Sequence, residues 1–179
     1  MVALSTVLGL IKVIHMPLGG DVTLLSMLPM IVLSVSLGVG WGLAGAFAYS
    51  LVQLIFGIAA DGLLGWGLSG WQLALCIMLD YILAYTALGL AGVFGKGKYS
   101  PLFGTALVLV FHFICHFLSG YIIFANFEKF VVFGKAFLGR PLLYSACYNG
   151  TYMLPETVIT CIAVFVLIKM NFFERMKKF

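Results

Sequence analysis

Residues 102–127, LFGTALVLVFHFICHFLSGYIIFANF, form a long stretch that contains no Asp, Glu, Lys or Arg. An α-helix needs about 20 apolar residues to cross a hydrocarbon core of about 30 Å, and this stretch is longer. Two histidines, His112 and His116, lie within it. Because they are four residues apart, they share one face of a helix. The stretch therefore predicts a membrane-spanning helix with one polar face that does not meet lipid.

The composition of the whole chain also indicates a membrane protein. Of 179 residues, 63% are hydrophobic and 9% are charged, and the mean hydropathy is +1.16. Soluble domains are about half apolar and about a quarter charged, so this composition excludes a water-soluble globule. We predict an all-α, polytopic membrane protein.

Breaks at polar, glycine-rich or proline-containing segments divide the chain into spans. The predicted helices cover residues 2–14, 22–37, 38–58, 71–94, 102–127 and 142–169. No linker or charge run separates them, so we expect one domain, residues 1–179, forming a compact bundle of six transmembrane helices. Residues 2–14 would rise only about 20 Å, which indicates a short or truncated first helix. A signal peptide is the alternative, but the segment lacks a basic leading region.

Basic residues near the ends of the spans predict the orientation. One side would carry Lys96, Lys98, Lys169, Arg175, Lys177 and Lys178; the other would carry Lys129, Lys135 and Arg140, with Lys12 nearby. Both termini are therefore predicted to be cytoplasmic, in a multi-pass protein of the cell membrane. The net charge of +4 is then a topology signal and not a nucleic-acid footprint.

Two features resemble cofactor sites without the context that such sites need. GVFGKGKYS matches the G-x-x-x-x-G-K skeleton from Gly92 to Lys98, but Tyr99 replaces the magnesium-binding Ser or Thr and no strand precedes the loop. If the function of the chain is transport powered by ATP, the ATPase is therefore expected to be another chain. The four cysteines lie inside predicted spans without CxxC spacing, so they indicate buried small side chains and no metal site. They are Cys76, Cys115, Cys147 and Cys161.

Ionisable residues inside the spans indicate a polar interior site. Asp80, His112, His116 and Glu156 would each be costly in lipid, and such residues usually face a cavity or a partner. By helical rise, Asp80 and His116 lie at similar depth in the outer half of the bilayer. Other polar and aromatic residues are expected around an outward-facing pocket: Tyr81, Tyr85, Tyr121, Phe124, Tyr144, Tyr148, Asn149 and Tyr152, with Trp66 and Trp71 at its mouth.

A carboxylate surrounded by ring faces suits a flat organic cation. Aromatic faces attract positive charge, and Asp80 would add a direct charge pair in a poorly screened site. Asn149 could read a heterocycle edge through its amide.

Several segments resemble the thiamine-specific substrate-binding subunits (ThiT/YuaJ family) of energy-coupling factor transporters. They are MPLGGDVTLLSMLP, LDYILAYTALGLAGVF, FICHFLSGYIIF and LYSACYNGTYMLPE, in this order along nearly the whole chain. The resemblance implies a prokaryotic six-helix protein without enzymatic activity or cofactor. It would capture thiamine from outside and dock on a coupling transmembrane subunit bearing two cytoplasmic ATPases.

The resemblance also assigns roles by position. It implies ligand contact by Asp80 and Tyr81, stacking by His116 and Phe124, and a close approach at Gly120. Tyr144 and Asn149 match pocket residues of the last helix. Some relatives have Glu for Asp80, Lys for His112, and Trp for Phe124. Some also carry a Trp in the first external loop, and Trp71 is predicted to substitute for it. The predicted substrate-binding residues are Asp80, Tyr81, His112, His116, Gly120, Phe124, Tyr144, Asn149 and Trp71.

Alternative functions remain open at this point. A binding subunit of the same architecture could take another vitamin or precursor, such as riboflavin or hydroxymethylpyrimidine. His112 and His116 with a nearby carboxylate could instead form the metal site of an intramembrane hydrolase, although no H-E-x-x-H pattern is present. Glu156 follows Pro155, and could bond to backbone freed by that proline or serve the site.

Small residues at four-residue spacing predict close helix packing. They are Gly38, Gly42 and Ala46 in one helix and Ala87 and Ala91 in the next. Packing inside the bundle is the preferred interpretation, and a docking face for the coupling subunit is the alternative.

Overall fold

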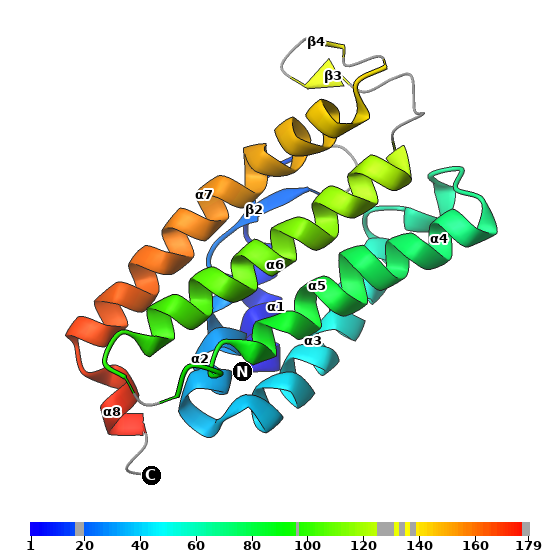
Figure 1. Cartoon of the computed structure of the whole chain (residues 1–179). Coiled ribbons are helices and arrows are strands. Elements are labelled where there is room, and N and C mark those ends of the chain that lie inside the picture. The colour runs from blue at the N-terminus through cyan, green and yellow to red at the C-terminus, as the bar shows by residue number, and fades with distance from the viewer. Residues whose placement is uncertain (17–19, 96, 125–130, 133–134, 137–138, 177–179) are drawn as a thin grey trace.

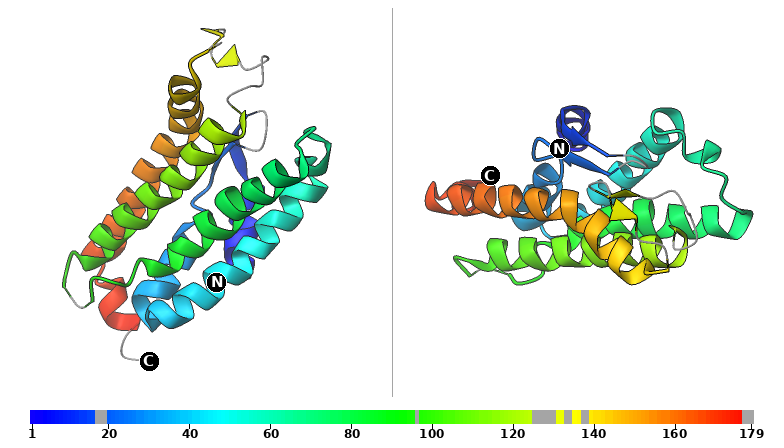
Figure 2. Two further views of the ribbon diagram at one scale, coloured as in Figure 1. Left: turned by 45° about the vertical axis from the view of Figure 1, so that its right-hand side comes forward. Right: turned by 90° about the horizontal axis from the view of Figure 1, so that it is seen from above.

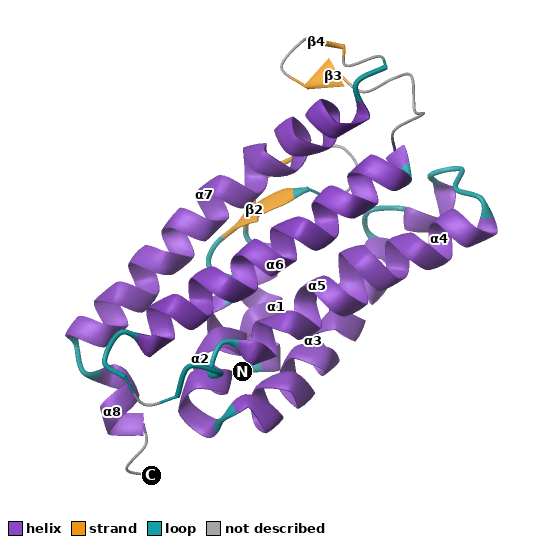
Figure 3. Ribbon diagram, viewed as in Figure 1, coloured by secondary structure: helices purple, strands orange, loops and turns teal. Residues whose placement is uncertain are grey.

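The computed structural model describes residues 1–16, 20–95, 97–124, 131–132, 135–136 and 139–176. Helices dominate it (Figure 3). The main helices are α1 (Val2–Leu10), α2 (Leu28–Leu37), α3 (Val39–Ala59), the segment of α4 (Gly70–Cys76), η3 (Ile77–Leu83), α5 (Ala84–Thr86) and η4 (Ala87–Leu90), then α6 (Ser100–Ile122), α7 (Pro141–Lys169) and α8 (Phe172–Met176). Short elements connect them: β1 (Lys12–His15), β2 (Asp21–Thr23), η2 (Leu63–Gly65), β3 (Val131–Val132) and β4 (Lys135–Ala136).

The all-α fold class and the six predicted helices are confirmed as helical segments. By length and composition, four of the described helices can cross a membrane: α3, the continuous helix Gly70–Leu90, α6 and α7. α1 and α2 have 9 and 10 residues, so each rises only about 15 Å and is too short to span alone. The predicted helix 102–127 begins at Ser100 and its helical part ends at Ile122, while residues 125–127 lie outside the described residues.

The helices pack as a bundle with two distinct ends. α6 and α7 lie side by side along most of their length, and the helix Gly70–Leu90 packs against both α3 and α6 (Figure 1). α8 lies at the end of the bundle where α6 begins, and β3 and β4 lie at the opposite end (Figure 1). The chain segment before α6 and the C-terminal helix thus share one end (Figure 1), as the predicted order of the spans requires.

The prediction of helices 2–14 and 22–37 was wrong at their adjoining ends. α1 ends at Leu10, and an antiparallel hairpin of β1 and β2 replaces the rest. Met16 N–H donates to the carbonyl of Gly20 at 2.8 Å, which closes the hairpin, and β2 packs against α7 (Figure 2). A segment as short as Lys12–His15 fits a strand or a helix equally well by periodicity, so the sequence pattern does not separate the two.

Small residues let α3 approach the helices on either side of it. Ser34 of α2 donates its hydroxyl to the carbonyl of Gly89 at 2.5 Å. A Cβ atom added at Gly42 would lie 2.6 Å from that carbonyl oxygen, so only glycine fits there. Ala46, Ala87 and Ala91 are buried, which confirms packing inside the bundle. Gly38 is the exception, because it ends α2 with a φ of 95°, and a Cβ atom added there would meet none of the described residues within 4 Å.

Candidate functional site

The bundle encloses a cavity of about 140 Å³ between the β1–β2 hairpin and the helices α3, η3, α6 and α7. This volume is several times what one buried water needs, so the cavity can hold a small organic molecule or several waters. Its lining includes Asp80, Tyr81, His112, His116, Gly120, Phe124, Tyr144 and Asn149, together with Lys12, Asp21, Asp61, Trp66, Tyr85, Tyr148 and Tyr152.

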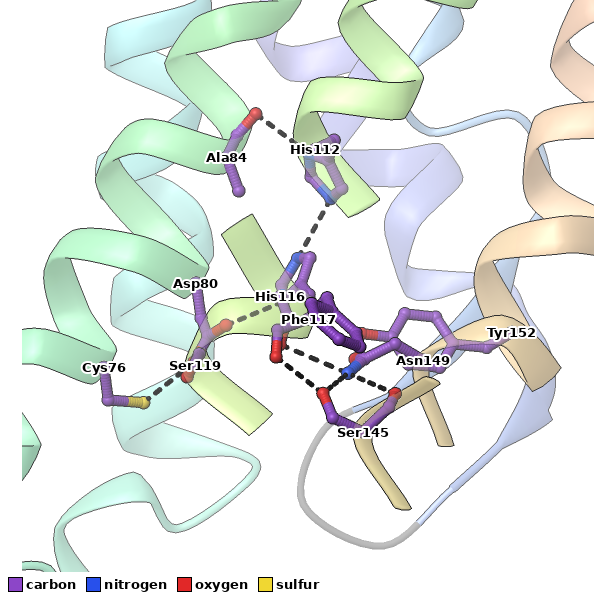
Figure 4. A network of polar contacts seen from close by, with 10 residues as sticks. All are labelled: Cys76, Asp80, Ala84, His112, His116, Phe117, Ser119, Ser145, Asn149 and Tyr152. Carbon is purple, nitrogen blue, oxygen red and sulfur yellow. Dashed lines mark hydrogen bonds and ion pairs between the residues drawn. The ribbon is translucent and has the colours of Figure 1, made fainter. Parts of the chain in front are cut away.

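A hydrogen-bonded chain of side chains crosses one wall of the cavity. Asp80 Oδ1 lies 2.8 Å from Nδ1 of His116. Nε2 of His116 lies 3.0 Å from Nε2 of His112, and Nδ1 of His112 lies 2.8 Å from the carbonyl oxygen of Ala84 (Figure 4). His112 is only 1% exposed. The structure therefore brings together the carboxylate and both histidines, which the sequence analysis placed on neighbouring helices.

The other carboxylate oxygen of Asp80 faces donors. The hydroxyl of Ser119 and the thiol of Cys76, at 3.2 Å, both donate to Oδ2 (Figure 4). Asp80 itself lies in the middle of η3, a π-helical stretch inside an otherwise α-helical span. Single π-helical turns occur frequently at functional sites because they re-aim side chains. Here the turn directs Asp80 and Tyr81 to the cavity.

Asn149 ties α7 to α6 at the next wall. Its amide nitrogen donates to the carbonyl oxygens of His116 at 3.1 Å and Ser145 at 3.0 Å. Its amide oxygen accepts from the hydroxyl of Tyr152 at 2.8 Å. Both ends of the amide are thus engaged within the protein. Gly120 of α6 lies against this contact, and a Cβ atom there would collide with the Ser145 hydroxyl. The close approach that Gly120 permits is therefore that of α6 to α7.

Aromatic rings form the remaining walls. The ring of Tyr85 meets that of His112 edge-on at 4.8 Å between centroids. Tyr144 and Tyr148 stack at 5.9 Å, and Trp66 meets Phe124 at 6.1 Å. These faces surround the carboxylate as the sequence predicted.

Trp71 is a correction to the predicted site. It lies in the first turn of α4 with 60% of its surface exposed, and it does not line the cavity. Trp66 lines it instead, held by a hydrogen bond from its indole N–H to the carbonyl of Asp61 at 3.0 Å. Tyr121 is also exposed and faces away from the cavity. Trp66 takes the place of Trp71 because of the loop between α3 and α4. In this loop, Gly62 and Gly67 adopt positive φ and turn Trp66 inward.

Three charged residues that the sequence analysis did not assign to the site lie at the cavity on the hairpin side. Lys12 Nζ is 2.7 Å from Asp21 Oδ2 and 3.3 Å from Asp61 Oδ1. Partial burial opposes the ammonium charge, but the hydrogen bonds and the attraction of both aspartates outweigh it and raise the pKa of Lys12. In the sequence, the only indication of this charged cluster is that Asp21 and Asp61 occur in polar breaks between spans. Charged residues in such breaks are usually exposed to solvent, so they do not predict a site.

Glu156 lies behind the cavity wall and not in it. It is 1% exposed, and its carboxylate accepts from the backbone N–H and the hydroxyl of Thr23, both at 2.8 Å. Asn149, Tyr152 and Glu156 share a buried face of α7, as predicted. Glu156 thus anchors β2 to α7 and does not bond to backbone at Pro155.

The contacts of the two histidines differ from those of metal ligands. Their Nε2 atoms face each other at hydrogen-bonding distance, and among the described residues no three His, Cys, Asp or Glu side chains are grouped to hold a metal ion.

The G-x-x-x-x-G-K motif has a packing role, because the N–H of its first residue, Gly92, donates to the hydroxyl of Ser34 at 2.9 Å.

Comparison with known proteins identifies the family. The profile of the family described as Thiamine transporter protein (Thia_YuaJ) matches residues 1–174. The chain belongs to this family. Its members are transporters, so the chain is a membrane transport protein and not an enzyme.

Two thiamine transporters illustrate the relationship. The chain is 30% identical to the thiamine transporter ThiT of Bacillus subtilis in an alignment of 183 positions, gaps included, that covers 93% of this chain and 85% of that one. The solved structure of ThiT from Listeria monocytogenes superimposes with a TM-score of 0.70 at 19% identity, covering 98% of this chain and 92% of the other. At that identity, the structural match supports the fold.

Proposed function

We propose that this chain is the thiamine-binding membrane subunit of an ATP-driven, energy-coupling-factor importer in a bacterial cell membrane. The observation that carries the proposal is the carboxylate of Asp80 in an aromatic cavity inside a bundle of the thiamine transporter family. Thiamine is a flat organic cation, and this cavity offers it one negative charge and several ring faces.

Each predicted residue has a proposed role in that cavity. Asp80 serves as counter-ion of the thiazolium ring, and His116 and Phe124 stack on the rings of the vitamin. Tyr81 and Tyr144 shape the walls. His112 and Asn149 hold His116 and α6 in place, and Gly120 permits the close contact of α6 and α7.

The resemblance of four segments to the substrate-binding subunits of energy-coupling factor transporters supports the choice of partners. In this proposal, two cytoplasmic ATPase subunits hydrolyse ATP and act through a coupling transmembrane subunit. The G-x-x-x-x-G-K skeleton of the chain itself has Tyr99 where magnesium binding needs Ser or Thr. Both termini face the cytoplasm, and the cavity opens toward the outside.

Intrinsic fluorescence tests the proposal with matched variants. Thiamine should quench the purified protein, and Trp71→Phe should retain this quenching because Trp71 lies outside the cavity. Trp66→Phe should lose most of the quenching while calorimetry still detects binding. Riboflavin and hydroxymethylpyrimidine, titrated in parallel, should bind more weakly.

Asp80→Asn tests the counter-ion. A charge pair at about 4 Å is worth about 4 kcal/mol at an effective dielectric constant of about 20, so thiamine affinity should fall at least about 100-fold. Unchanged affinity in this variant, or tighter binding of one of the other two vitamins, would refute the proposed function.

A further inference from the structure

The hydrogen-bonded chain from Asp80 to Ala84 fixes how many protons the site holds. The carbonyl of Ala84 can only accept, so the Nδ1 atom of His112 carries a proton. The contact between the two Nε2 atoms needs one proton between them. The contact between His116 Nδ1 and Asp80 Oδ1 needs another, because a bare carboxylate cannot donate.

Three hydrogen bonds therefore hold three protons. Two neutral imidazoles supply two, one on each ring. The third is an extra proton, and it makes the group of Asp80, His112 and His116 electrically neutral whichever atom carries it. This count depends only on which atoms can accept, and not on the choice of tautomer.

The donors around Asp80 place the extra proton on the imidazole rings. Oδ2 of Asp80 accepts from both Ser119 and Cys76, and two donors on one oxygen stabilise the ionised carboxylate. His116 stands between this carboxylate and the lone pair of His112. His116 is therefore the ring that carries a proton on each of its two nitrogens, as an imidazolium.

Other titratable groups face this pair without supplying the missing charge. From α5 and α7, phenol rings pack edge-on against the histidines at centroid distances of 4.8 to 6.5 Å, and free phenols are neutral at pH 7. On the hairpin side, Lys12 is shared between two aspartates. The facing groups are Cys76, Tyr81, Tyr85, Tyr144, Tyr148 and Tyr152, with Lys12, Asp21 and Asp61 across the cavity.

We infer that the empty site contains its own cation, His116, and that a cationic guest replaces it at Asp80 with release of one proton. This inference rests on the proposed function, since it takes the guest to be a cation that pairs with Asp80. A guest that takes the place of His116 at Oδ1 leaves the imidazolium without its counter-ion and beside a like charge. The N–H bond at Nδ1 of His116 then breaks, its electron pair stays on nitrogen, and the proton passes to the external buffer.

Calorimetry in buffers of different ionisation enthalpy measures this proton directly. Thiamine binding should release about one proton near neutral pH, and its affinity should rise up to about tenfold per pH unit while the pair is protonated. A neutral isostere, with carbon in place of the quaternary thiazolium nitrogen, should bind without releasing a proton.

Variants of the two histidines separate this effect from a structural role. His112→Gln keeps a donor toward Ala84 and an acceptor toward His116, so proton release should persist. His116→Gln can donate to Asp80 without titrating, so the residual binding of thiamine should release no proton and lose its pH dependence. Release of a proton by the His116→Gln variant would overturn the assignment.

The nitrogen spectrum of the empty protein gives a readout that needs no ligand. NMR of ¹⁵N-labelled histidine should show one imidazolium and one neutral ring within this pair at pH 7. Thiamine binding without proton release would overturn the inference and leave the proposed function intact. Two neutral rings in the spectrum would overturn the imidazolium at His116, and the inference with it. Failure of thiamine to bind would overturn the proposed function.

Discussion

Replacing Glu156 with glutamine should loosen the β1–β2 hairpin from α7. The carboxylate of Glu156 accepts two hydrogen bonds from Thr23, one from its backbone N–H and one from its hydroxyl, both at 2.8 Å. Glutamine has nearly the same shape, but its neutral amide accepts only through its oxygen, so the contact with the Thr23 hydroxyl would reverse and the amide NH₂ would donate to it while the hydroxyl donates to Ser26. The charge of the acceptor would be lost from both contacts at a site that is 1% exposed.

The size of the effect follows from this loss of charge. Hydrogen bonds to charged groups contribute about 1.5–3 kcal/mol, and part of this is regained because a neutral amide is easier to bury. We expect the free energy of hairpin opening to fall by about 2 kcal/mol, or about 30-fold in the open population. Thiamine affinity should fall by at most the same factor, because the hairpin supplies Lys12, Asp21 and Thr23 to the cavity.

Hydrogen exchange of the Thr23 amide in detergent or nanodiscs measures the opening. Thr160→Val is the matched control, since Thr160 lies one turn further along α7, is fully buried, and its hydroxyl has no hydrogen-bond partner among the described residues. This control should leave the exchange rate of Thr23 unchanged. Equal exchange rates at Thr23 in the wild type and Glu156→Gln would refute the anchoring role.

Two further predictions concern the packing and the charges around the cavity. Gly120→Ala should destabilise the protein by about 1–3 kcal/mol, because its Cβ would collide with Ser145. The control is Gly40→Ala on α3, whose Cβ meets nothing within 4 Å and which should be neutral or slightly stabilising. Thermal unfolding compares the two variants, and equal midpoints would contradict the packing argument. Lys12→Met should cost no more than about 1 kcal/mol, because Lys12 is 31% exposed, and the loss should shrink as the salt concentration rises and screens the ion pairs with Asp21 and Asp61. A loss that stayed constant up to about 1 M salt would show that the ion pairs do not cause it.

Hydropathy predicts the spans of this protein because lipid leaves the backbone few options. Only helices and closed barrels satisfy backbone hydrogen bonds in the hydrocarbon core, so an apolar run such as the one that forms α6 (Ser100–Ile122) had to be helical. The same reasoning placed Asp80, His112 and His116 in the interior, since each is costly in lipid. Asp80 and His116 lie at similar depth in their helices, and they therefore meet in one wall of the cavity.

The hairpin and the charges beside it could not be predicted in this way. Residues 12–15 are only four in number, with two β-branched residues at their centre, and hydropathy does not distinguish such a strand from the last turn of a helix. Lys12, Asp21 and Asp61 meet only after the hairpin folds against α3, and their spacing in the sequence does not indicate this contact. The exchange of Trp71 for Trp66 depends on the positive φ of Gly62 and Gly67, which the sequence pattern does not fix.

The π-helical stretch around Asp80 lets this span hold one residue more than a regular α-helix would within the same turn. Its hydrogen bonds close over five residues and not four, so the extra residue is accommodated locally between Ile77 and Leu83. Deleting one residue inside the stretch can therefore restore α-helical hydrogen bonds and keep the two halves of the span in rotational register, although the side chains at the deletion change. A deletion in the α-helical part of the same span cannot be absorbed in this way, and it would turn one half relative to the other by about 100°.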